Sequence, residues 1–188
     1  ELRGVDPRID SLLHDEEKHE EMLMSMIDQE ALSYSGSIVL GLNDALVELL
    51  GALAGLTLAL GDTNLIAMVG LITGTAAAFS MAGSEYLSTL EEEQRSPMRA
   101  SLYTGLSYIF AVAMLIVPYF VFENAYVCLG IAVSVALVIM LAFTYYIAFV
   151  KDSPVKKRFL RMAAIGLGVA LVNFGIGAAV KRFLGVEI

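Results

Sequence analysis

The chain has 188 residues and a formal net charge of −8; 57% of its residues are hydrophobic and only 17% are charged. No soluble globular domain needs a mean hydropathy of +0.72 to build its core, so the composition excludes that class of protein. We therefore predict an all-α, polytopic membrane protein.

The negative charge is concentrated at the N-terminus, where residues 1–30 contain ten acids and three bases. Such a segment repels nucleic acid and attracts cations. Asp6 and Pro7 are typical of a helix start, and apolar residues follow them at helical spacing. We expect residues 1–32 to form an amphipathic acidic helix. Because residue 1 is Glu rather than Met, we also expect further chain upstream of it.

Glu16 and His19 are three residues apart in this helix, so a carboxylate and an imidazole share one face. A Glu-x-x-His pair is the ligand unit that single helices contribute to di-iron carboxylate bundles. The surrounding LLHDEEKHEEML resembles the last helix of a ferritin-like, rubrerythrin-type domain. One helix cannot complete such a site, so other ligands would come from upstream or from a second protomer. The alternative is a solvated acidic helix that binds no metal.

The rest of the chain, 33–188, contains five apolar stretches that are long enough to cross a bilayer. Short polar gaps separate them, and Pro97 and Pro154 end helices in two of these gaps. The predicted spans cover about residues 36–60, 65–88, 102–121, 125–150 and 160–180.

Lysine and arginine lie in the second and fourth gaps and are absent from the first and third. By the positive-inside rule, those two basic gaps and the N-terminus face the cytoplasm. The odd number of spans then places the C-terminus on the opposite side.

The first span carries two acids, Asp44 and Glu48, one helical turn apart, with Asn43 beside them. A carboxylate at mid-membrane costs about 2.5–3.5 kcal/mol on insertion scales, so such an acid is a functional-site hypothesis by default. In the second span, Met81 and Glu85 are also four residues apart. Because the first helix runs outward and the second inward, these groups are predicted to lie at similar depth.

Carboxylates together with a thioether sulfur favour a first-row divalent ion over Mg²⁺ or Ca²⁺, because sulfur is the softer ligand. Fe²⁺ and Mn²⁺ are the natural candidates. Carboxylates that lose a proton to bind metal, and regain one to release it, also provide proton coupling. The pattern predicts a metal/proton antiporter that needs no organic cofactor.

Two motifs at these residues resemble those of the vacuolar iron transporter family: GLNDAL at 41–46 and SMAGSEY at 80–86. The family's first-helix acid corresponds to Asp44, and its second-helix methionine corresponds to Met81. The resemblance covers about residues 33–188. It implies a homodimer that exchanges Fe²⁺ or Mn²⁺ for protons, with the pathway between the two first helices, and that moves metal out of the cytosol.

The chain departs from plant-type members of the family at two places. Those members carry a further acid two turns before the methionine, where this chain has Thr73; Glu48 and Glu85 are the candidates to supply that charge. They also insert a Glu-rich cytoplasmic domain between spans two and three, where this chain has only EEEQRSPMR. The acids that remain there are candidates to pass metal to the pathway: Glu91, Glu92 and Glu93.

The family branch with an N-terminal ferritin-like domain lacks that insert, in agreement with the reading of residues 1–32 as a remnant of such a domain. This resemblance favours a prokaryotic plasma membrane with the N-terminus in the cytoplasm; a eukaryotic source would imply a vacuolar membrane.

Two other functions stay open at this point. A membrane-anchored ferritin-like iron oxidase would use the spans only as an anchor, which leaves the two acids of the first span unexplained. A transporter of another substrate would use these acids only as a proton relay. The leading prediction is a proton-coupled Fe²⁺/Mn²⁺ exporter and not an enzyme. Its predicted pathway and metal-binding residues are Asn43, Asp44, Glu48, Met81, Glu85, Glu91, Glu92, Glu16 and His19.

Overall fold

The computed structural model describes residues 34–92, 95–151 and 155–184, and over these ranges every regular element is an α-helix. The expected acidic helix over 1–32, with Glu16 and His19, lies outside the described residues, as does Glu93. The helices are α3 (Ser35–Leu60), α4 (Thr63–Leu90), α5 (Pro97–Val121), α6 (Ala125–Lys151) and α7 (Val155–Leu184).

All five helices are long and apolar enough to cross a membrane, which confirms the prediction of a multi-pass membrane protein. Two helices begin earlier than the apolar stretches indicated. The third was expected from about residue 102, but α5 begins at Pro97, a residue that is favourable in the first turn of a helix. The fifth was expected from about residue 160, but α7 begins at Val155 with a polar, basic turn. Hydropathy marks the part of a helix in the bilayer and misses a turn that continues into water.

The turn between α3 and α4 is short because two residues reverse the chain. Gly61 has a φ of 75°, in the left-handed region that glycine adopts without strain. The next residue, Asp62, caps α4 by accepting a hydrogen bond from the backbone N–H of Leu65 at 2.8 Å. This turn sends α4 back antiparallel to α3.

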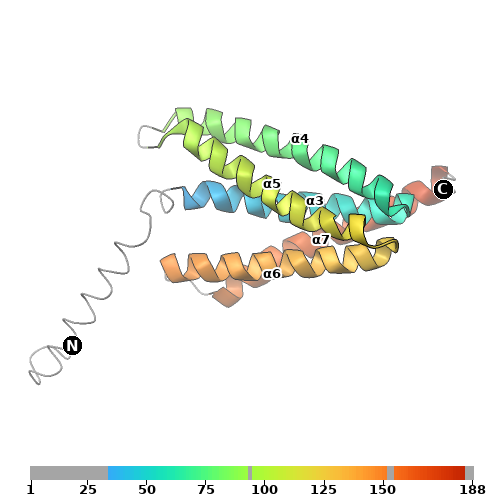
Figure 1. The fold of residues 1–188 in the computed structure, drawn as a ribbon. Coiled ribbons are helices and arrows are strands. Elements are labelled where there is room, and N and C mark those ends of the chain that lie inside the picture. The colour runs from blue at the N-terminus through green and yellow to red at the C-terminus, as the bar shows by residue number, and fades with distance from the viewer. Residues whose placement is uncertain (1–33, 93–94, 152–154, 185–188) are drawn as a thin grey trace, which may run out of the picture. The chain divides into compact units, whose positions relative to one another are not determined.

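Successive helices alternate in direction, so α3, α5 and α7 run one way and α4 and α6 run the other (Figure 1). Helix α4 packs against α5, α5 against α6, and α6 against α7. Helix α3 contacts several of the others and contributes fully buried core residues, including Leu46, Leu50 and Leu53. The hydroxyl groups of Thr57 in α3 and Tyr119 in α5 share a buried hydrogen bond of 2.9 Å.

Candidate functional site

Two contacts establish the register of α3 against α4. At one end, the Ser37 hydroxyl in α3 donates to Oε1 of Glu85 in α4 at 2.5 Å. About three turns along, Glu48 of α3 and Thr73 of α4 line one small cavity. Since the helices are antiparallel, Met81 lies between these two levels, one turn of about 6 Å from Glu85.

Asp44 and Glu48 form a pair of interacting acids on α3. The two residues are four positions apart on one face of the helix, so their carboxyl groups interact electrostatically. Asp44 is half-buried, whereas Glu48 is exposed on the surface of the single chain. Two ionised carboxylates this close repel each other unless a proton or a cation lies between them. Such a pair favours the binding of a proton or a cation.

Tyr108 in α5 is a member of this site that the sequence reasoning missed. Its side chain is completely buried, and its hydroxyl donates to Oε2 of Glu48 at 3.3 Å. Tyr108 also lines the cavity that Glu48 and Thr73 share, which has a volume of about 40 Å³. A tyrosine in an apolar span gives no signal in the sequence, because only the packing of α5 on α3 brings the two residues together.

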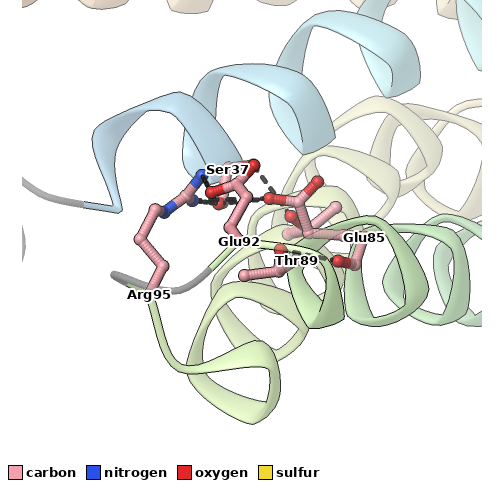
Figure 2. A network of polar contacts seen from close by, with 6 residues as sticks. Ser37, Glu85, Thr89, Glu92 and Arg95 are labelled. Carbon is pink, nitrogen blue, oxygen red and sulfur yellow. Dashed lines mark hydrogen bonds and ion pairs between the residues drawn. The ribbon is translucent and has the colours of Figure 1, made fainter.

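A second polar network joins the first turn of α3 to the end of α4 and the α4–α5 loop (Figure 2). The guanidinium group of Arg95 lies 3.5 Å from Glu85 Oε1 and 3.3 Å from Glu92 Oε2, and it also donates to the Ser37 hydroxyl. The Glu85 side chain is only 11% exposed and that of Arg95 is 25% exposed. Glu85 is thus held by two partners in this structure.

The backbone of Ser37 is hydrogen-bonded to a neighbouring helix as well. The Thr104 hydroxyl of α5 donates to the Ser37 carbonyl at 3.1 Å, and Ser37 is 1% exposed. In the same network, the Thr89 hydroxyl donates to the Glu85 carbonyl at 2.7 Å. Together, the bonds of Ser37 to Glu85 and to Thr104 connect α3, α4 and α5 at this end of the bundle. Glu91, at the C-terminal cap of α4, is exposed beside the network.

Asn43, next to Asp44 in the chain, carries an unsatisfied polar atom. Its side-chain oxygen is buried and accepts no hydrogen bond in the described structure. A buried acceptor without a partner costs about 1–3 kcal/mol, so such atoms in native structures call for a physical reason. A cation or a proton donor that enters this site would supply the missing partner.

The comparison with known families bears on both groups of residues. The model of the VIT family matches residues 36–95 and 89–178, two overlapping segments that together cover well over half of the chain. The chain belongs to the VIT family. This result confirms the resemblance to vacuolar iron transporters that the GLNDAL and SMAGSEY motifs indicated. No curated protein matches the chain in a sequence comparison.

VIT proteins are membrane metal transporters rather than enzymes, and this family membership makes a metal ion the substrate class. The matched segments contain Asp44, Glu48, Met81 and Glu85. The match begins at residue 36, so the ferritin-like reading of residues 1–32 stays a prediction.

In the part of the VIT chain that the structure describes, the acidic, histidine and cysteine side chains do not form a metal cage. Within the described ranges, no three such side chains converge on one point. Four of the described acids occur instead in two separate sets, Asp44 with Glu48 on α3 and Glu85 with Glu92 around Arg95. Met81 packs against the hydrophobic core at a level between Glu85 and the Glu48 cavity.

Proposed function

We propose that this VIT protein is a homodimeric antiporter that exchanges Fe²⁺ or Mn²⁺ for protons and exports the metal from the cytosol. One observation carries the proposal. A carboxyl pair, the half-buried Asp44 and the exposed Glu48, lies on a helix that is apolar enough to cross a membrane. A pair of this kind is costly in lipid and useful only where ions or protons pass.

The exposure of Glu48 supports the dimer. A second copy that packs its α3 against this α3 would remove both acid pairs from lipid. Symmetry about a twofold axis would then place four carboxyl groups around a common path. That arrangement would bring the second copy's carboxyl pair to the same path as further ligands.

Met81 supports the choice of metal. Oxygen ligands alone suit Mg²⁺ and Ca²⁺, whereas a thioether near the path adds preference for a transition metal. Protonation of Asp44 and Glu48 on one side and metal binding on the other would couple the two fluxes, because a carboxyl group loses its proton to bind metal. No organic cofactor is needed for this cycle.

Charge supports the orientation. Basic residues lie near the ends where α4 meets α5 and α6 meets α7: Arg95, Arg99, Lys156, Lys157 and Arg158. The positive-inside rule places this end in the cytoplasm. Glu91 and Glu92 would then stand at the cytoplasmic entrance, where Glu16 and His19 of the acidic segment would deliver metal.

The test is metal uptake into proteoliposomes under an imposed pH gradient, followed with a trapped fluorescent chelator. We expect the intact chain to transport Fe²⁺ and Mn²⁺, and we expect the metal flux to stop when the pH gradient is collapsed. Asp44→Asn and Met81→Ala should reduce the flux, with Asp44→Asn at the level of empty liposomes because the acid pair loses one charge.

Asp62→Asn is the matched control, because it neutralises an acid in the α3–α4 turn while asparagine still caps α4. This variant should transport normally. Absence of gradient-dependent flux from the folded wild-type protein would rule out the antiporter.

A further inference from the structure

Two buried tyrosines of α5 have hydroxyl groups that reach α3, and they differ in what they meet. Tyr119 is 1% exposed and shares a 2.9 Å hydrogen bond with the Thr57 hydroxyl. Tyr108 is 0% exposed, and its hydroxyl lies 3.3 Å from the Glu48 carboxylate. The first contact joins two neutral groups inside the bundle. The second connects the buried core to an acid on the exposed face.

Glu48 is placed by contacts on two sides. Its carboxyl group interacts with that of Asp44, one turn earlier on α3. Its Oε2 atom accepts the hydrogen bond from Tyr108, at the edge of the cavity that Thr73 also lines. A glutamate side chain on an exposed helix face otherwise samples several rotamers, and ordering it costs conformational entropy. The hydrogen bond from the Tyr108 hydroxyl restricts the rotamers of Glu48.

The 3.3 Å length of the Tyr108–Glu48 hydrogen bond is consistent with a contact that becomes shorter when the metal binds. Hydrogen bonds between hydroxyl groups and oxygen acceptors are usually about 2.7–2.8 Å long, and those at functional sites are often longer before the substrate binds. The ring of Tyr108 cannot move away, because it is fully buried in the core cluster. Any shortening of the contact would therefore come from a movement of the Glu48 side chain.

We propose that Tyr108 is a positioning residue, which holds Glu48 beside Asp44 so that the two carboxyl groups meet the metal as a pair. The proposal rests on the proposed function and assigns a role to a residue that does not itself touch the ion. Positioning of this kind reduces the conformational entropy that the Glu48 side chain loses when the metal binds. Loss of the hydroxyl should therefore weaken capture of the metal more than the later steps.

The main experiment is a double-variant cycle read as Mn²⁺ uptake kinetics in proteoliposomes. Tyr108→Phe keeps the ring and removes the hydroxyl, and we expect the KM for Mn²⁺ to rise about tenfold while the maximal rate changes less than about twofold. Glu48→Asp keeps the charge but withdraws the carboxylate by one methylene from the hydroxyl, so it should raise KM similarly. The double variant should be no worse than Glu48→Asp alone, since the two changes break one contact.

Tyr119→Phe is the matched control, because it removes a buried hydroxyl from the same helix at a site without acids. It should leave KM unchanged even if the thermal stability falls. If Tyr108→Phe does not fold, Glu48→Asp can still overturn the proposal, because an unchanged KM would show that the distance from the Glu48 carboxylate to the Tyr108 hydroxyl does not matter.

An unchanged KM in Tyr108→Phe or in Glu48→Asp overturns the proposal. Effects of the two changes that add in the double variant, or a loss of maximal rate at constant KM, also overturn it. These outcomes differ from failure of the proposed function, in which the wild-type protein itself would show no flux driven by the pH gradient.

Discussion

Glu48 is the acid that lies where a carboxylate at position 73 would lie. Plant-type relatives are expected to carry a carboxylate at the position of Thr73, and its absence left two candidates for the missing charge. Thr73 and Glu48 line one cavity from α4 and α3, so the Glu48 carboxylate reaches the same space from the neighbouring helix. Glu85 lies about 18 Å from Thr73 along α4 and is bound to Ser37 and Arg95. The geometry favours Glu48.

This relation predicts that the charge can be moved between the two helices. Glu48→Ala should reduce metal flux several-fold, and Thr73→Glu added to it should restore part of the flux, because the new carboxylate enters the space that Glu48 vacates. The measurement is Mn²⁺ uptake in proteoliposomes. Thr73→Gln in the same background is the control for side-chain size. Equal recovery with glutamine would show that volume, and not charge, is what the cavity needs.

Some residues of the candidate site could be found from their spacing along one helix, and others could not. Asp44, Glu48, Met81 and Glu85 were found from i, i+4 spacing within single spans, and their roles in transport stay predictions. Tyr108 was not found, because its partner is 60 residues away in the chain. The binding of Glu85 by Arg95 was missed for the same reason, since nothing local indicates that a loop cation folds back onto a helix end.

At the scale of elements, the contact between α3 and α7 depends on glycine. A Cβ atom at Gly177 would collide with the carbonyl oxygen of Gly55, and one at Gly55 would lie 2.9 Å from the Asn173 carbonyl oxygen. Neighbouring backbones therefore approach here more closely than any other residue allows. Gly175, two positions earlier in α7, has open space where its Cβ would be.

The difference between these glycines predicts opposite outcomes for the same substitution. Gly177→Ala should lower the free energy of unfolding by about 1–3 kcal/mol, because the methyl group meets backbone that cannot move aside. Gly175→Ala should be neutral or slightly stabilising, since alanine favours a helix over glycine. Thermal unfolding in detergent measures both. Equal melting temperatures for the two variants would contradict the close contact.

At the scale of the whole molecule, the acids of α3 share an exposed face with Leu40, which is 43% exposed one turn before Asp44. Ala52 lies one turn beyond Glu48 on the same side and is half-buried. A single chain in a bilayer would expose this face, with its charged groups, to lipid. The proposed second copy is the physical means of covering it.

The dimer predicts where oxidative cross-links form. In a Cys128→Ser background, Leu40→Cys or Ala52→Cys should yield a disulfide-linked dimer in membranes treated with a mild oxidant, because a residue near the twofold axis lies close to its own copy. Val138→Cys, on the exposed side of α6, is the control and should remain monomeric on a denaturing gel. Cross-linking at Val138 alone would place the interface on a different helix.

The sequence by itself determined that the described part of the chain consists of five helices long and apolar enough to cross a membrane, because composition and the length of apolar runs report directly on the solvent around each segment. Its motifs also determined the family, through residues that lie within single helices. Only the tertiary structure decided which groups meet: Tyr108 with Glu48, Glu48 with Thr73, and Arg95 with Glu85. Spacing along one helix defines a face, but the partner of that face depends on how separate helices pack, and no local pattern encodes that.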